Sequence, residues 1–277
     1  MRRESVRVDS SRVFLGPMDA SKGVFFPNRG VRKCVMSRKF SILLVVAAMA
    51  AFLGVMPASA DIIIYQDTFT GDGAVHGTTP DVTLGLYGGT AGATWVAGAG
   101  WTKSGGIATI GAEADAYLPF VPQAGWIYTL SADVDGISAG NFIGLMFARG
   151  PGMLTGVGWW ICRDPDNSYV YHGPGTTDPL YGPFSHAGGV QTYSVILDTR
   201  PASPSNWTYT CKLGGTTCVP ATAFGFDPAI TQVKMYGLAS AGSVDNFKLT
   251  VIPEPSTLAL LATGLIGLLC YAWRKRK

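Results

Sequence analysis

Hydrophobic residues are distributed along the chain in two ways. Two stretches, Ile42–Val55 and Leu258–Trp273, are uncharged and almost continuously apolar. Between them, apolar and polar residues alternate in short segments such as Trp126–Val134, a pattern typical of half-buried antiparallel strands. Glycine, proline, asparagine and aspartate separate these segments. The pattern predicts an all-β domain at residues 61–252 between two apolar terminal segments.

Short strands at regular spacing favour an antiparallel β-sandwich or jelly roll, and about 190 residues are enough for one core. The segments expected to form strands are Ile62–Tyr65, Thr94–Ala97, Ile107–Ile110, Ala116–Phe120, Trp126–Val134, Phe142–Phe147, Val157–Cys162, Tyr169–Tyr171, Thr192–Leu197, Trp207–Leu213, Thr231–Leu238 and Val244–Val251.

Residues 1–60 have the composition of a leader with a secretory signal peptide. Basic residues after Met36 precede the apolar stretch Ile42–Val55, and small residues, Ala58 and Ala60, precede Asp61. Cleavage between Ala60 and Asp61 by signal peptidase, after passage through the Sec translocon, is expected. Counted from Met36, the signal has an ordinary length, so translation is expected to start there.

The C-terminal segment, residues 253–277, has three parts. Pro253, Glu254 and Pro255 precede the apolar run Leu258–Trp273, and four basic residues, Arg274–Lys277, follow it. The run is close to the length that spans a bilayer as a single helix. Basic residues are retained on the cytoplasmic side, so the domain before Pro253 is expected in the periplasm. The prolines favour an extended, accessible peptide at the outer edge of the span.

This order of Pro253-Glu254-Pro255, apolar helix and basic tail resembles the PEP-CTERM sorting signal of Gram-negative bacteria. The resemblance implies that an exosortase, a membrane cysteine transpeptidase, recognises the tripeptide and removes the helix. It also implies a transient inner-membrane anchor and a final location at the cell surface or in the extracellular polysaccharide. The alternatives are a plain C-terminal anchor or a peptide cut by an unrelated protease.

The charge of the chain is unevenly divided. The net charge of +3 includes basic leader and tail segments, whereas residues 61–252 hold seven basic and fourteen acidic residues. An acidic domain repels polyanions. No nucleic-acid partner is therefore expected.

Three cysteines fall in the predicted domain. Cys211 and Cys218 flank a short turn with Gly214-Gly215, and an oxidising compartment would allow them to form a disulfide. Cys162 is then either a buried apolar residue or the partner in an intermolecular link.

Several short motifs in residues 61–252 are similar to those of secreted concanavalin-like or laminin-G-like sandwiches. The resemblance implies that the first and last strands pair, which would bring Asp67 and Asp245 together. Its motifs are Asp67-Thr68-Phe69, Thr94-Trp95, Leu118–Pro122, Gly125–Leu130, Gly144–Phe147 and Val244–Phe247.

A structural calcium ion is one use for these carboxylates. Calcium requires only oxygen ligands, which Asp67, Asp245 and Asn246, or the loop Asp164–Asn167, could supply. The alternative is the ordinary role of aspartate and asparagine in turns. The three histidines, His76, His172 and His186, lack the spacing of a transition-metal site.

Catalytic motifs are weak, and the domain is expected not to be an enzyme. A glycoside hydrolase needs two carboxylates across the cleaved bond, but Glu113 is the only glutamate in residues 61–252, and Asp115 is its nearest acidic neighbour. Gly136–Gly140 matches the nucleophile elbow of hydrolases, but an apparent strand follows it instead of a helix.

Aromatic residues are concentrated at Trp159, Trp160, Tyr169, Tyr171 and Tyr181. Sugar rings stack on such side chains, so this stretch is a candidate glycan-binding site; ordinary sandwich packing is the alternative. The sequence thus predicts an exported structural or adhesive protein, with a lectin-like module as the main alternative and a hydrolase as the third.

Overall fold

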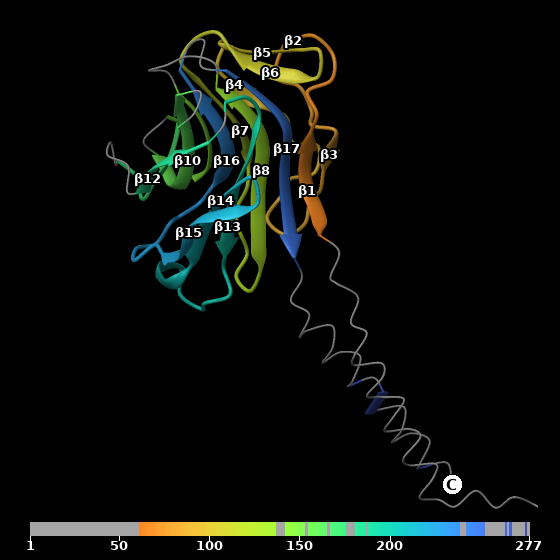
Figure 1. Ribbon diagram of the computed structural model, residues 1–277. Helices are drawn as coiled ribbons and strands as arrows, with labels where there is room; N and C mark the ends of the chain where they lie inside the picture. Colours follow the sequence, from red (N-terminus) through yellow and green to blue (C-terminus); the bar gives the residue numbers. More distant parts are fainter. Residues whose placement is uncertain are drawn as a thin grey trace, which may run out of the picture. The chain divides into compact units, whose positions relative to one another are not determined.

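The computed structural model describes residues 61–136, 142–152, 155–164, 167–175, 181–186, 188–238 and 242–252, together with residues 264, 266, 267 and 275 (Figure 1). The predicted leader and its cleavage site at Ala58 and Ala60 lie outside the described residues, as do the tripeptide Pro253–Pro255 and most of the apolar run after it.

The larger sheet has ten strands, all paired antiparallel. Its strand order is β15-β14-β13-β8-β17-β6-β5-β2, while β1 pairs with β17 and with β3. The bounds are Ile62–Asp67 (β1), Gly73–Ala74 (β2), Val82–Thr83 (β3), Trp101–Ser104 (β5), Ile107–Ile110 (β6), Ile127–Gly136 (β8), Gln191–Asp198 (β13), Thr208–Leu213 (β14), Thr216–Ala223 (β15) and Gly242–Ile252 (β17).

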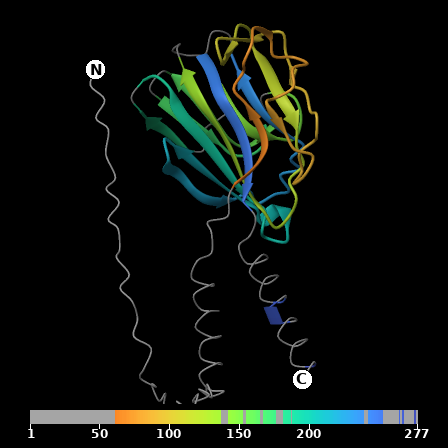
Figure 2. The same ribbon diagram turned by 90° about the vertical axis from the view of Figure 1, so that its right-hand side faces the viewer.

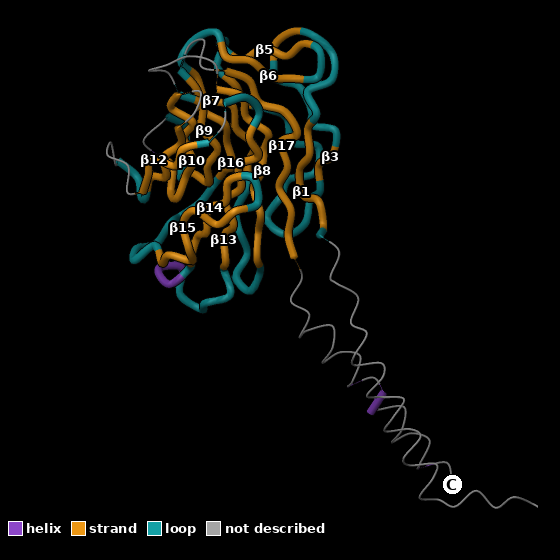
Figure 3. The backbone as a smooth tube through the Cα atoms, viewed as in Figure 1, coloured by secondary structure: helices purple, strands orange, loops and turns teal. Residues whose placement is uncertain are grey.

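The smaller sheet has seven strands in the order β12-β11-β10-β9-β16-β7-β4. Figure 2 shows the two sheets as the layers of a sandwich, and Figure 3 shows that strands and loops make up nearly all of it. A short 3₁₀ helix, Pro204–Asn206, precedes β14. The bounds are Val96–Ala97 (β4), Ala114–Pro119 (β7), Ile143–Ala148 (β9), Gly156–Asp164 (β10), Asn167–Tyr171 (β11), Tyr181–Ser185 (β12) and Gln232–Gly237 (β16).

The main core lies between the sheets and follows the predicted alternation. In β8, Tyr128, Leu130 and Ala132 are buried, whereas Thr129 and Ser131 between them are only half-buried. Successive side chains of a strand point to opposite faces, so one face of each sheet supplies the core. The all-β antiparallel sandwich is confirmed, and so is the pairing of the first and last strands, in which Asp67 lies opposite Phe247.

Candidate functional site

The outer face of the seven-stranded sheet is unusual because it too is buried. Every residue of β9 and of β16 is buried, so both faces of these neighbouring strands are covered. In β16, Val233 and Met235 belong to the main core. Alternation therefore places Gln232, Lys234 and Tyr236 on the opposite face, which we call the outer face.

Lys234 lies at the centre of the outer face and is completely buried. Its Nζ donates to the carbonyl oxygen of Gly150 at 3.2 Å, to that of Gly152, and to Oγ1 of Thr155 at 2.9 Å. Its three N–H groups thus have partners in the loop between β9 and β10. A lysine in this position fixes that loop over the sheet.

Asp115 provides the opposite charge for Lys234. One carboxylate oxygen lies 3.7 Å from Nζ of Lys234 and also accepts a hydrogen bond from the backbone N–H of Gly152. Burial lowers the pKa of Lys234 to about 8, and the charge of Asp115 counteracts part of this effect.

Tyr236 connects the outer face to Glu113. Its hydroxyl donates to Oε1 of Glu113, which is exposed, while the Tyr236 ring is 3% exposed. Burial raises the pKa of Tyr236, and the neighbouring carboxylate adds to that shift. Tyr236 thus contacts Glu113 through its hydroxyl and lies opposite Asp115 in the strand register, and each carboxylate already has a protein hydrogen-bond donor.

A small aromatic cluster lies beside these polar groups. Buried Met146, Ala148, Tyr171 and Tyr236 form a core cluster separate from the main one, and half-buried Phe142 and Tyr169 pack against it. Phe142 stacks on Tyr236 with ring centroids 5.6 Å apart. The outer face thus offers aromatic surface next to an exposed carboxylate.

The predicted glycan-binding residues are divided between two faces of the sheet. Tyr169 and Tyr171 belong to the outer cluster, whereas Tyr181 packs against the main core. Of Trp159 and Trp160, only the backbone is described: Trp159 pairs with Tyr171, and Trp160 pairs with Val170. The five residues therefore do not all share one site.

The carboxylates suggested for calcium have other roles. Asp67 is 2% exposed, and its two oxygens accept hydrogen bonds from Nε1 of Trp95 at 2.6 Å and from the backbone N–H of Phe69 at 2.8 Å. Burial raises the pKa of Asp67, partly offset by these bonds. Asp245 pairs with Asp133 and contacts Asn246. Both oxygens of Asp67 thus already have protein donors, and a calcium ion at Asp67 and Asp245 stays a prediction.

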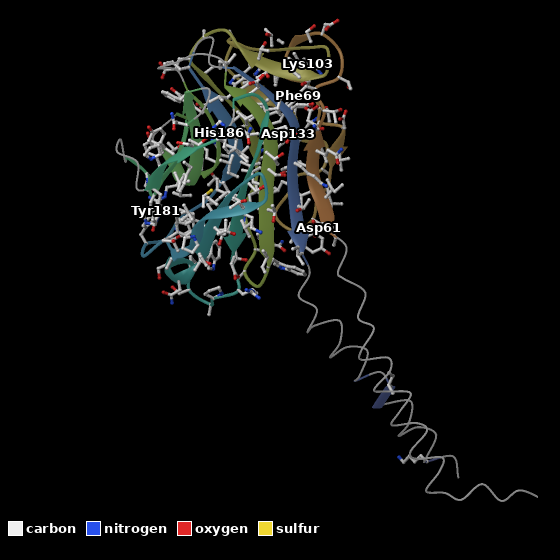
Figure 4. All side chains as sticks on the ribbon, viewed as in Figure 1. Asp61, Phe69, Lys103, Asp133, Tyr181 and His186 are labelled. Atoms are coloured by element: carbon white, nitrogen blue, oxygen red, sulfur yellow. The ribbon has the colours of Figure 1, made fainter. Side chains whose placement is uncertain are left out.

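Within the described segments, no group of three or more histidine, cysteine or acidic residues could hold a metal ion. His172 and His186 contact tyrosines instead. Nδ1 of His172 lies 2.9 Å from the Tyr209 hydroxyl. Nε2 of His186, which is labelled in Figure 4, lies 3.3 Å from the Tyr193 hydroxyl.

The predicted disulfide is not present. Cys211 and Cys218 are free thiols. The turn at Gly214-Gly215 does join two strands, β14 and β15, but irregularities in their pairing on both sides of Cys211 place it opposite Val219. Burial raises the pKa of the Cys211 thiol well above its usual value.

The outer-face residues missed by sequence reasoning are Lys234 and Tyr236. Each lies more than a hundred residues from its acidic partner, Asp115 for Lys234 and Glu113 for Tyr236, so no local spacing relates them. The only signal was the Glu113-x-Asp115 spacing, which puts two carboxylates on one side of a strand.

The fold defines this protein as a two-sheet antiparallel β-sandwich whose last strand, β17, ends at Ile252. Residues 251–277, which begin at the end of β17, match the model of the PEP-CTERM protein-sorting motif. The motif marks the chain as a target of exosortase sorting. Within the parts that the structure describes, no helix is both long and apolar enough to cross a membrane.

Several solved structures are similar to the chain, whereas no curated protein matches it. The Emp46p carbohydrate recognition domain in its metal-free form shares 13% identity, with 67% of this chain and 97% of that one covered and a TM-score of 0.41. SO2946 of Shewanella oneidensis, of unknown function, shares 12%, with 80% and 96% covered and a TM-score of 0.42. A galectin-like protein of Bacillus subtilis shares 14%, with 58% and 90% covered and a TM-score of 0.35.

Proposed function

We propose that the chain is an exported protein, processed by an exosortase, whose sandwich domain has a structural or adhesive role at the cell surface or in the extracellular polysaccharide. The observation that carries the proposal is the sorting motif at residues 251–277. In this proposal the domain is held in transit by the apolar run Leu258–Trp273 and has no catalytic role.

The position of the motif relative to the fold supports removal of the tail. The last strand, β17, ends at Ile252, and its residues up to Ile252 pair with β8. The sandwich is thus complete before Pro253, so cleavage near Pro255 breaks no strand pairing of the core. A sorting enzyme could release the domain without unfolding it.

Intact mass of the protein recovered from cells and medium tests this proposal. We expect a species that begins at Asp61 and ends close to Pro255, and retention of the whole tail in cells without exosortase. Glu254→Ala should also retain the tail, whereas the matched control Glu113→Ala should be processed normally. A soluble cytosolic protein with both ends intact would refute the proposal.

Carbohydrate binding is the second candidate, and the outer aromatic cluster supports it. Tyr169 and Phe142 are half-buried at the edge of this cluster, and exposed Glu113 lies beside it through Tyr236. Purified residues 61–252 are tested on arrays of polysaccharide fragments. Binding that disappears in Tyr169→Ala but persists in Tyr181→Ala supports the candidate, because Tyr181 packs on the opposite side of the sheet. Equal loss in both variants counts against it.

A further inference from the structure

An exposed apolar patch lies at the end of the sandwich where the chain leaves it. Leu86 and Val121 are 58% and 60% exposed, the highest values among large hydrophobic residues of the described domain apart from Val190 at 63%. Half-buried Tyr87 and Trp126 lie beside them, with ring centroids 5.0 Å apart. We call these four residues the exit patch.

Two loops build the exit patch, and their backbones are locked together. The backbone N–H of Val121 donates to the carbonyl oxygen of Gly88 at 3.0 Å. Gly88 has φ +92°, and a Cβ there would lie 2.0 Å from the carbonyl oxygen of Val121, so only glycine allows this approach. Tyr87 is held at φ +55°, a strained conformation for an aromatic residue. The backbone conformation of the two loops therefore fixes the position of the patch.

Strand pairing fixes the position of the patch beside both chain ends of the domain. Ile127, which follows Trp126, pairs with Ile252, and Ile62 pairs with Val251. The backbone N–H of Leu84 donates to the carbonyl oxygen of Ile64, which ties the first loop to β1. Figure 4 labels Asp61 at this end of the sandwich and Lys103 at the opposite end.

Neither loop carries a charge: residues 84–92 and 119–127 contain no lysine, arginine, aspartate or glutamate. Isolated exposed apolar side chains are ordinary, but two uncharged loops that together expose aliphatic side chains beside an aromatic pair are typical of an interaction surface. Tryptophan and tyrosine beside aliphatic residues are also the composition of the membrane–water interface.

We infer that the exit patch rests on the surface of the lipid bilayer while the tail is still attached. This inference rests on the proposed function. Only five residues, 253–257, separate Ile252 from the apolar run. Fully extended, they reach about 18 Å, so the patch is held close to any bilayer that contains the run. A short tether raises the local concentration and populates even a weak apolar contact.

Thr199, which hydrogen-bonds to Trp126, lies between Asp198 and Arg200, so the rim of the patch carries a partly exposed ion pair. A bilayer is favoured as the occupant because the five residues after Ile252 hold the patch beside the membrane, whose interface accommodates aromatic and basic side chains. The contact orients the domain with the peptide 253–255 at the interface. Removal of the tail abolishes the tether, and the domain then leaves the membrane.

Hydrogen exchange tests the inference. The full chain is reconstituted in vesicles of phosphatidylethanolamine and phosphatidylglycerol and compared with soluble residues 61–252. We expect backbone amides of residues 84–92 and 119–127 to exchange several-fold more slowly on vesicles, and those next to Val190 to be unchanged. The double variant Leu86→Ser/Val121→Ser in the full chain should lose this protection, whereas Val190→Ser should keep it.

The other outcomes separate the two proposals. Equal exchange in both samples, with the tail resistant to carbonate extraction, would overturn the bilayer contact and leave the proposed function intact. A chain that does not enter vesicles would overturn both. If protection appears only when exosortase is present in the vesicles, the exit patch binds a protein and not the bilayer, and the inference is wrong.

Discussion

The outer faces of the two sheets differ in how far their side chains are buried. On the ten-stranded sheet, Thr129, Ser131 and Ser194 are half-buried between core residues, so that face is in contact with water. On the seven-stranded sheet, β9 and β16 are buried on both sides. The outer face of the ten-stranded sheet is thus mostly half-buried, with Thr250 of β17 as a buried exception, whereas the centre of the seven-stranded sheet is buried on both faces.

The difference depends on one buried cation. The loop between β9 and β10 contributes two carbonyl groups and the Thr155 hydroxyl to Lys234. Burying a charged group raises the free energy of the folded state unless the group is fully paired. The buried ammonium group of Lys234 therefore requires this loop to remain in place. The outer face of the seven-stranded sheet is therefore stabilised by specific polar contacts.

Removal of Lys234 should have the largest effect. Lys234→Ala leaves half-buried Asp115 without its cation, so the free energy of unfolding should fall by about 3 kcal/mol. The carbonyl groups of Gly150 and Gly152 lose one donor each but keep those from Gln232 and Thr155. Ser131→Ala, on the other sheet, should change it by less than about 0.5 kcal/mol. Urea denaturation of purified residues 61–252 measures both. Similar values for the two variants would show that the outer faces do not differ energetically.

The pH dependence of stability should show the same asymmetry with a smaller effect. The pKa of Lys234 is about 8 in the fold, against 10.5 for an ordinary lysine. Between these values the unfolded chain binds the proton that the folded protein has released, so stability rises with pH. Relative to Lys234→Met, which cannot titrate, the wild type should gain about 2 kcal/mol between pH 8 and pH 10. A pH-independent difference would mean that the lysine is not desolvated.

The strands of the seven-stranded sheet were predicted more completely from sequence, since only β12 was missed, whereas β2, β3, β5 and β15 of the ten-stranded sheet were not expected. Which side chains face the core was clearest in the ten-stranded sheet. Strict alternation in Trp126–Val134 indicates which side chains of β8 enter the core, and the structure confirms it. Of the hairpin formed by β14 and β15, the sequence predicted β14 and the Gly-Gly turn. It did not predict β15, because Pro220 within this segment is unfavourable for a strand.

The candidate site on the outer face could not be predicted in the same way. Lys234 interrupts the apolar pattern of β16 and resembles a solvent-exposed residue in the sequence. Its burial depends on Gly150, Gly152 and Thr155, about eighty residues earlier. Contacts of this kind are set by sheet order and register, which local periodicity does not specify.

The Tyr236–Glu113 contact should be a minor contributor. Tyr236→Phe removes one hydrogen bond to an exposed carboxylate, and we expect a loss of about 1 kcal/mol in the free energy of unfolding. Tyr117→Phe, on the neighbouring strand, is the matched control and should have little effect. Turnover of any polysaccharide by the wild type, abolished by Glu113→Gln, would instead identify this contact as part of an enzyme site.

The two thiols of the ten-stranded sheet should give the smallest effect. Cys218 is half-buried and Cys211 fully buried, so a maleimide should label Cys218 in the folded protein and reach Cys211 only after unfolding. A reductant should leave the melting temperature unchanged, because no bond joins the two residues. Peptide mapping of protein recovered from the medium distinguishes the alternatives. A linked peptide containing both cysteines would show that export forms the disulfide that is absent from the structure.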